Sequence, residues 1–366
     1  MGLKNMNRAR NIFKALALIV LLSSCGREMN QTPATDSGVE YALGFNITEI
    51  SDGYQIVLKH SGDTLLLSRT KPTDNEKHII HIPIKKAVCF STTYVSFITC
   101  LNEVESIKGL SGLKYVCNPL VVQQIETNRI QEVGFDRQLD YERIIAIRPD
   151  VVFAFGVDNE SLSGFQKLVK LGMPIVLVDD YLESQPLGRT EWIKFFGCFY
   201  DKLPMAQNYF DSVADRYNEI KAQPIQHHPK VLVGLPWKGT WWVPGGDSFF
   251  ANFIKDAGGV YATENASSES VPYSLEQIFS AASDADVWLN VSEKTRRGQI
   301  PEVDHRLEKF QPYKQAKIYN NNKIVNQYGG CDFWESGIVH PEVILQDLRN
   351  IFEEKDSNLF YYVKLD

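Results

Sequence analysis

Three tryptophans, Trp237, Trp241 and Trp242, lie within six residues of one another in the second half of the chain. Their spacing, interrupted by Lys238 and Gly239, fits neither the two-residue period of a strand nor the 3.6-residue period of a helix. Indole rings present large flat surfaces that favour contact with other ring systems. We interpret this segment as an apolar wall for a large planar ligand. The alternative is a wholly buried cluster in the core.

A second group of side chains that could do chemistry, Asp179, Asp180 and Glu183, follows an apolar run that ends at Val178. Carboxylates this close together can assist hydrolysis or bind a cation. However, the sequence contains none of the GxSxG, HExxH or GxxxxGKS/T motifs of common hydrolases and nucleotide-binding enzymes. We therefore interpret the three carboxylates as the solvated rim of a loop, and we expect a protein that is not an enzyme.

The chain begins with a positively charged segment and continues with an almost wholly apolar one. Lys4, Arg8 and Arg10 precede the apolar residues 12–22. This layout is typical of a secretory signal peptide, and the apolar run is shorter than the roughly 20 residues that a membrane-spanning helix needs. We therefore expect residues 1–24 to be a signal peptide.

The apolar run ends in the sequence Leu-Ser-Ser-Cys, whose last residue is Cys25. This tetrapeptide resembles a bacterial lipobox, in which the cysteine is lipidated and becomes the mature N-terminus. The alternative is an ordinary cleavage site beside a chance cysteine. Residues 25–40 are polar and small, which is typical of a flexible linker. We expect an exported protein that is anchored to the membrane through Cys25, on the periplasmic side.

Composition narrows the class of partner. The formal net charge is −7 and no run of Lys and Arg occurs, so we expect no binding to nucleic acid. Besides Cys25 the chain has five cysteines, an odd number without a CxxC pair, which argues against a disulfide framework or a zinc ribbon. A bridge between Cys89 and Cys117 stays open. We expect a monomer without a resident cofactor.

The elements that must position these residues begin with an extension at residues 41–80. Residues 45–69 alternate apolar and polar side chains, with Asp52-Gly53 and Ser61-Gly62-Asp63 as turn signals. This pattern predicts a meander of short antiparallel strands.

Strand and helix patterns then alternate over residues 81–185 and again over residues 226–366, which predicts two α/β lobes with parallel sheets. A chain of this length also favours two lobes over a single core. In the first lobe we expect strands at residues 88–90, 114–117, 150–155 and 174–178, and helices at residues 94–101, 141–147 and 162–171. In the second lobe we expect strands at residues 230–235, 286–290, 317–319 and 324–325, and helices at residues 249–257, 274–281 and 340–352.

A single long helix is predicted between the lobes, within residues 186–225. Its apolar side chains recur at spacings of three and four, which defines one face of a helix; they are Ala206, Phe210, Val213, Tyr217 and Ile220. Pro204 near its start and Pro224 just past its end suit these boundaries. The predicted fold is therefore two α/β lobes joined by one bridging helix, with an N-terminal antiparallel β-meander.

The segment DYERIIAIRPDVV at residues 140–152 resembles a signature of the class III periplasmic substrate-binding proteins, which serve ABC importers for cobalamin, ferric siderophores and haem. Four further segments resemble this family in the same order, so that the resemblance covers roughly residues 82–352. They are residues 165–178, GGDSF to DAGG at 245–259, VPYSLEQI at 271–278, and DFW at 332–334 followed by PEVIL at 341–345.

The resemblance implies docking residues. In the family, one glutamate on each lobe pairs with arginines of the ABC permease, and Glu142 and Glu276 occupy the matching positions. The alternative is that each is an ordinary carboxylate at the start of a helix, where the helix dipole favours negative charge.

The resemblance also places the ligand in a cleft between the lobes, lined by loops that follow the strands. Together with the three tryptophans, it implies ligand contacts from Tyr273, Phe333 and Trp334 of the second lobe. From the first lobe it implies Thr92, Thr93 and Tyr94, whose hydroxyls would orient the ligand.

A bare metal ion is a poor expectation for this cleft. Relatives with the same architecture that bind zinc or manganese place histidines after the strands of the first lobe, and none follows residues 88–90 or 150–155 here. Only His340, close to the segment at 332–334, is kept as a contact to a chelate. We expect an iron chelate of the siderophore type as ligand, with cobalamin or haem as alternatives. A chelatase or esterase acting on a bound chelate, and an adhesin or scaffold, are the alternatives from other classes.

Overall fold

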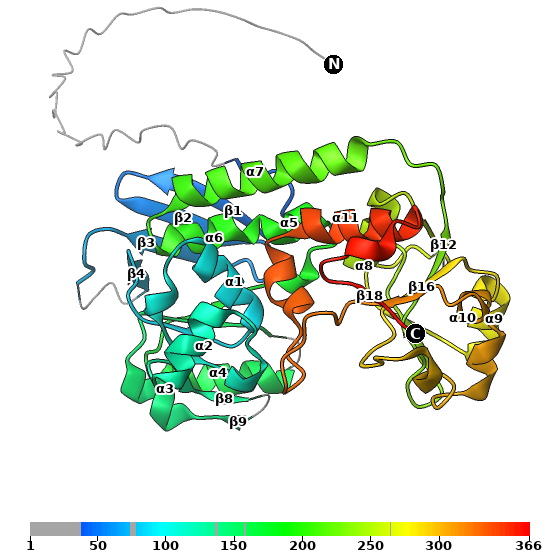
Figure 1. The fold of residues 1–366 in the computed structure, drawn as a ribbon. Helices are drawn as coiled ribbons and strands as arrows, with labels where there is room; N and C mark the ends of the chain where they lie inside the picture. Colours follow the sequence, from blue (N-terminus) through cyan, green and yellow to red (C-terminus); the bar gives the residue numbers. More distant parts are fainter. Residues whose placement is uncertain (1–37, 74–77, 136–137, 157–158, 264) are drawn as a thin grey trace, which may run out of the picture. The chain divides into compact units, whose positions relative to one another are not determined.

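The computed structural model describes residues 38–366, except residues 74–77, 136–137, 157–158 and 264 (Figure 1). The predicted signal peptide and the lipidation site Cys25 lie outside the described residues. Among the described helices, none is long and apolar enough to cross a membrane.

The N-terminal extension is a four-stranded sheet in the order β1-β2-β3-β4. Strands β1 (Phe45–Ile50), β2 (Gly53–Leu58) and β3 (Thr64–Ser68) pair in antiparallel fashion, which confirms the predicted meander. Strand β4 (Ile79–His81) then joins β3 in parallel. The ring of Phe45 on β1 contacts the ring of Trp192, with 4.7 Å between the centroids. The meander therefore packs on the segment 186–225 that links the two lobes.

The first lobe contains a parallel five-stranded sheet in the order β11-β10-β5-β6-β7. Its strands are β5 (Ala87–Cys89), β6 (Ile107–Leu110), β7 (Gln131–Glu132), β10 (Val151–Ala154) and β11 (Ile175–Leu177), and β8 (Gly134–Phe135) forms a small hairpin with β9 (Gln138–Leu139). Its helices are α1 (Thr92–Cys100), α2 (Pro119–Glu126), α3 (Tyr141–Ile147) and α4 (Asn159–Lys170).

One predicted strand of this lobe is wrong. Residues 114–117 overlap a short 3₁₀ turn at Leu113–Tyr115, and the strand lies earlier in the chain, at β6. This strand is hard to recognise in the sequence, because Gly109 interrupts its apolar run. A side chain at this position would come within 2.5 Å of a methyl group of Val133, so close packing of the sheet requires glycine.

Three helices link the lobes: α5 (Pro186–Thr190), α6 (Trp192–Phe199) and α7 (Leu203–Ala222). Helix α7 confirms the predicted long helix and packs on α6 and on the C-terminal helix α11 (Pro341–Phe352) (Figure 1). Just before its start, Lys202 donates to the carbonyl of Leu101 in the first lobe at 2.7 Å. Near its end, the hydroxyl of Tyr217 donates to Asp256 of the second lobe at 2.8 Å. The helix therefore contacts both lobes.

The second lobe contains a five-stranded sheet in the order β14-β12-β16-β17-β18, parallel except for the last strand. Its strands are β12 (Lys230–Val233), β14 (Val260–Tyr261), β16 (Val287–Leu289), β17 (Ile318–Asn320) and β18 (Val363–Lys364), and its helices are α8 (Phe249–Asp256), α9 (Leu275–Ala282), α10 (Gln311–Lys314) and α11 (Pro341–Phe352). A separate hairpin of β13 (Trp241–Val243) and β15 (Val271–Tyr273) was not predicted. The strand predicted at residues 324–325 is wrong, since only Val325 pairs, in an isolated bridge with Cys331.

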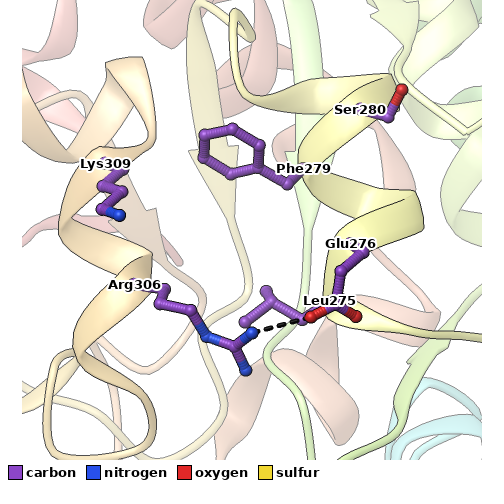
Figure 2. A pocket seen from close by; sticks show the side chains of 6 residues that line it. All are labelled: Leu275, Glu276, Phe279, Ser280, Arg306 and Lys309. Carbon is purple, nitrogen blue, oxygen red and sulfur yellow. Dashed lines mark hydrogen bonds and ion pairs between the residues drawn. The ribbon is translucent and has the colours of Figure 1, made fainter.

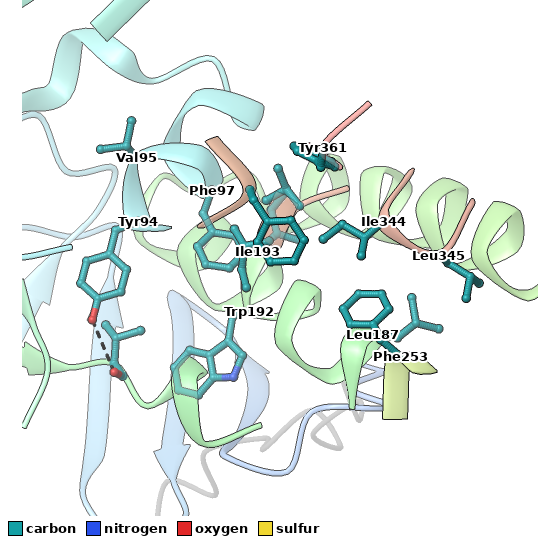
Figure 3. Packing of buried hydrophobic residues seen from close by; sticks show 14 of the residues in the cluster. Tyr94, Val95, Phe97, Leu187, Trp192, Ile193, Phe253, Ile344, Leu345 and Tyr361 are labelled. Atoms are coloured by element: carbon teal, nitrogen blue, oxygen red, sulfur yellow. Dashed lines mark hydrogen bonds between the residues drawn. The ribbon is translucent and has the colours of Figure 1, made fainter. Parts of the chain in front are cut away.

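The two lobes share one core. A continuous cluster of buried apolar side chains includes residues of the meander, of both lobes and of the linking helices. Figure 3 shows part of it, where Trp192 and Ile193 of α6 lie among side chains that include Phe97 of α1 and Ile344 of α11. A smaller second cluster covers the other face of the first sheet. Because apolar packing continues between the lobes, large domain rotations would have to break it.

Candidate functional site

The hairpin β13–β15 separates the tryptophans that the sequence placed together. Trp241 is fully buried, stacks on Trp288 with ring centroids 5.8 Å apart, and donates its indole N–H to the carbonyl of Val233 at 3.0 Å. Trp242, the next residue, points to the opposite face of the hairpin and is 52% exposed. The expectation that all three indoles form one wall is therefore corrected, because Trp241 belongs to the core.

The exposed indole Trp237 lies in a tight turn that follows β12. Its backbone N–H donates to the carbonyl of Thr240 at 2.7 Å, and the N–H of Thr240 donates back at 3.1 Å. Its ring is 64% exposed, with the Lys238 ammonium 4.3 Å from the ring centroid. Exposed indoles offer a large flat surface to a ligand, so Trp237 and Trp242 are the strongest aromatic candidates for a ligand contact.

The other predicted aromatic contacts of this lobe, Tyr273, Phe333 and Trp334, also differ in how far they are exposed. Tyr273 lies opposite Trp241 in the hairpin and is partly exposed. Phe333 is buried and stacks on Phe250 at 5.9 Å, whereas Trp334 packs edge-on against the same ring and keeps 45% of its surface exposed. Phe333 is thus a core residue, and its assignment as a ligand contact is corrected.

The first lobe contributes the start of helix α1. Ser91 caps this helix, and its hydroxyl lies 2.8 Å from that of Thr93. Thr92 and Thr93 are partly exposed. Tyr94 is not, because its hydroxyl points inward and donates to the carbonyl of Ala154 at 3.4 Å. Burial raises the pKa of Tyr94 well above its ordinary value. Its assignment as a ligand contact is also corrected.

Asn290 is a candidate functional residue that the sequence did not indicate. It directly follows β16, a central strand of the second sheet, and adopts a left-handed backbone conformation with φ 58°. Both polar atoms of its amide are buried without a regular hydrogen bond among the described residues, as is the nearby hydroxyl of Tyr362. Unsatisfied buried polar groups and left-handed residues often occur at functional sites. The only sequence signal was an Asn at the end of an apolar strand.

The acidic cluster after β11 is structural, and its interpretation as a solvated rim is wrong. Glu183 is buried and accepts hydrogen bonds from the backbone N–H groups of Leu43 and Gly44 at 2.9 and 2.8 Å. Asp180 is buried beside Arg189, 3.5 Å away, and burial raises its pKa. Asp180 and Glu183 are therefore occupied by contacts within the protein, and Glu183 holds the backbone at Leu43 and Gly44 in place.

The two predicted docking residues lie on the surface in equivalent positions. Glu142 is exposed in the first turn of α3, and Glu276 is exposed in the first turn of α9, which Ser274 and Gln277 cap reciprocally. Glu276 accepts from Arg306 at 2.7 Å, and its own backbone N–H together with Arg306 lowers its pKa.

A cavity of about 410 Å³ lies beside Glu276. Figure 2 shows Leu275, Glu276 and Phe279 of α9 on one side and Arg306 and Lys309 on the other. Leu275 and Phe279 give it an apolar part, and the charged residues surround that part. A surface of this kind can accept an apolar side chain flanked by charges.

His340 contacts neighbouring side chains of its own chain. Its ring nitrogen Nδ1 lies 3.4 Å from Glu342, and its ring packs against Tyr209. Throughout the part of the chain that the structure describes, no three His, Cys, Asp or Glu side chains are grouped to hold a metal ion. The five described cysteines are free thiols, so Cys89 and Cys117 are not bridged here.

These features can be compared with known proteins. The sequence profile of the periplasmic binding protein family matches residues 88–324, which is more than half of the chain. The chain belongs to this family. The class III resemblance is thereby confirmed.

Individual relatives are distant. An uncharacterised lipoprotein of Methanocaldococcus jannaschii is 26% identical over 313 residues, covering 82% of this chain and 72% of the relative. The structure of a possible iron-binding periplasmic protein of Staphylococcus epidermidis is similar with a TM-score of 0.59 at 18% identity, covering 74% of this chain and 98% of the other. A periplasmic haem-binding protein of Pseudomonas aeruginosa gives a TM-score of 0.58 at 15% identity, with coverages of 77% and 98%. At these identities, the two structures support the fold alone.

Proposed function

We propose that this chain captures an organic metal chelate between its lobes and delivers it to an ABC permease, with a ferric siderophore as the first candidate ligand. The observation that supports this most is the pair of exposed indoles, Trp237 and Trp242, in the second lobe. Flat rings suit the large surface of a chelate, whereas a bare ion needs a group of donor side chains. Cobalamin and haem are the alternatives of the same class.

The proposed contacts are the members of the predicted set that remain accessible. They are Thr92, Thr93, Trp237, Trp242, Tyr273 and Trp334. Intrinsic tryptophan fluorescence of the full chain should be quenched by a ferric siderophore, cobalamin or haem at micromolar concentration or below. Calorimetry with the same compounds would separate binding from optical absorption by the ligand. Absence of binding for all three classes would contradict the proposal.

We propose that the protein is anchored through a lipid on Cys25. The lipobox-like sequence supports this, as does the description of a relative as a lipoprotein. Expression with a radiolabelled fatty acid should label the wild type, whereas Cys25→Ala should be unlabelled and released from membranes. Equal labelling of the two would contradict the assignment.

We further propose that Glu142 and Glu276 contact basic residues of the permease. Both are exposed in first turns of helices, one on each lobe, as a contact that involves both lobes requires. The ion pair between Glu276 and Arg306 does not prevent this, since exposed pairs contribute only about 0–1 kcal/mol and exchange readily.

A further inference from the structure

Two loops, one from each lobe, are joined by a network of polar contacts. The loop after β6 in the first lobe includes residues 114–118, and the loop after β17 in the second lobe includes residues 326–335. The side-chain amide of Asn326 donates to the carbonyls of Lys114 and Val116, at 2.9 Å each. Its oxygen accepts from the backbone N–H of Gly330, also at 2.9 Å, so that Asn326 holds both loops at once.

The carboxylate of Glu335 makes the second part of this network. Glu335 is only 2% exposed, and its two oxygens accept from the backbone N–H groups of Cys117 and Asn118 at 2.8 and 2.7 Å. Asn118 in turn caps helix α2, accepting from Leu120 at 3.0 Å. A residue of the second lobe therefore fixes the start of a helix in the first lobe.

At Gly330 the two backbones come too close for any side chain. A Cβ atom on this residue would lie 2.0 Å from the carbonyl oxygen of Tyr115. In addition, the thiol of Cys117 donates to the carbonyl of Gly330 at 3.3 Å. Nothing the size of a ligand can fit between the loops at this position.

A second contact between the lobes lies toward the other edge of both sheets. The amide of Asn252 on α8, just before β14, donates to the carbonyl of Ser184 at 2.9 Å. Beside it, the guanidinium of Arg189 on the linking helix α5 lies over the ring of Phe249, 5.0 Å from its centroid. In the strand orders, β5 and β10 lie between these two contacts in the first lobe, and β12 and β16 lie between them in the second.

We propose that Asn326, Gly330 and Glu335 form an interlobe latch with residues 114–118, and that this latch holds the lobes at a fixed separation during ligand capture. The ligand then binds between the latch and the contact of Ser184 with Asn252, among the loops that follow β5, β10, β12 and β16. Glu335 is a positioning residue in this scheme, because it acts on the ligand only through the separation of the lobes. The inference rests on the proposed function for its location of the ligand, but the latch can be tested without one.

The test is hydrogen exchange on the full chain without ligand, together with small-angle scattering. We expect slow exchange of the Cys117 and Asn118 amides in the wild type and at least tenfold faster exchange in Glu335→Ala. Glu335→Gln keeps one acceptor oxygen and should restore protection at one of the two amides. Gly330→Ala reaches the same contact from the backbone side and should also accelerate exchange at these amides.

Asp347→Ala is the matched control, because Asp347 binds backbone amides in the same way but within the second lobe. Its carboxylate accepts from the N–H groups of Phe360, Tyr361 and Tyr362 at 2.7–3.1 Å. This variant should accelerate exchange at residues 360–362 and leave the scattering profile unchanged. Glu335→Ala should instead broaden the distribution of interatomic distances, as expected for lobes that separate.

Two results would overturn the latch: unprotected Cys117 and Asn118 amides in the wild type, or a scattering profile of Glu335→Ala identical to that of the wild type. Once a chelate is found to bind, Glu335→Ala should also release it several-fold faster, while Asp347→Ala should not. If no chelate binds to the wild type, the proposed function fails, and exchange and scattering still decide whether the latch exists.

Discussion

The two lobes present different chemistry where their central strands end. The first lobe offers small hydroxyl groups, Thr92 and Thr93, at the start of α1, and it buries its aromatic residue Tyr94. The second lobe exposes the indoles Trp237 and Trp242. Rings contribute contact area with little directional preference, whereas hydroxyls contribute direction with little area. In the proposed site, the second lobe would therefore supply most of the affinity, and the first lobe would orient the ligand.

We expect the largest effect on chelate binding from removing the two exposed indoles of the second lobe. A double substitution of Trp237→Ala and Trp242→Ala should weaken chelate binding by about 2–3 kcal/mol, since each ring contact contributes roughly 1–1.5 kcal/mol. This corresponds to a roughly 30- to 150-fold increase in Kd. Calorimetric titration would measure it.

Phe360→Ala provides the control for this pair, because Phe360 is an aromatic residue of the same lobe with a similar exposed fraction, 52%. It should change Kd less than twofold. Equal weakening by the control, or unchanged binding by the double variant, would contradict a role of the exposed indoles.

The second prediction concerns the connection between the lobes and uses pH. Burial raises the pKa of Glu335 to about 7, the Cys117 and Asn118 amides act in the opposite direction, and the neighbouring carboxylate of Asp332 raises it further. A carboxyl group whose pKa is higher in the folded state than in the unfolded one stabilises the fold most at low pH, and this contribution is lost as the pH rises through about 7. The shift corresponds to about 3 kcal/mol at most.

Urea unfolding at pH 5 and pH 8 should show this loss. The wild type should lose about 2–3 kcal/mol relative to Glu335→Gln over this interval, because glutamine does not titrate. Asp179, Asp180 and Asp347 also have raised pKa values, but they are shared by both proteins and cancel in the difference. Parallel pH profiles of the two proteins would show that Glu335 does not titrate in this range.

The third prediction compares the two lobes at the proposed permease contact. Glu276→Arg would gather three cations with Arg306 and Lys309, whereas Glu142→Arg reverses a single charge. Both should lower uptake, by tenfold or more for Glu276→Arg and by less for Glu142→Arg, because like charges would meet at the contact. Chelate affinity should stay within twofold, and stability within about 0.5 kcal/mol.

Glu219→Arg on α7 is the matched control, since Glu219 is also an exposed helical glutamate. Uptake should be unaffected by it. If both docking variants transport normally, or if they lose the ligand instead, Glu142 and Glu276 are ordinary carboxylates at helix starts.

The sequence predicted elements that carry their own local signals. Helix α7 has a regular apolar face between two prolines, and α3 ends just before Arg148-Pro149, so both were found at their observed positions. The hairpin β13–β15 was missed because Pro272 in one strand and the adjacent indoles in the other mask the alternation. Its pairing depends on residues about 30 positions apart, which no local pattern reports.

The same limit applies to the site. Which of Trp241 and Trp242 is buried depends on the face of the hairpin, and a shift by one residue exchanges the two. Likewise, Glu183 resembles a solvated loop residue in the sequence because its partners are backbone N–H groups about 140 residues away. The exposure of these residues is set by tertiary contacts, which no local pattern reports.

We expect the smallest effect on chelate binding from removing a hydroxyl group of the first lobe. Thr92→Val keeps the shape of the side chain and removes its hydroxyl, so it should cost about 0.5–1.5 kcal/mol of binding, up to roughly tenfold in Kd. Thr93→Val also removes the contact with the Ser91 hydroxyl at 2.8 Å, and it serves to separate a disturbed helix start from a lost ligand contact. If the hydroxyl orients the ligand, Thr92→Val should reduce discrimination between related chelates more than it reduces affinity for any one of them. Titration of the wild type and both variants against a series of ferric siderophores would measure this. A loss of affinity as large as that of the double tryptophan variant would mean that the first lobe, rather than the second, dominates binding.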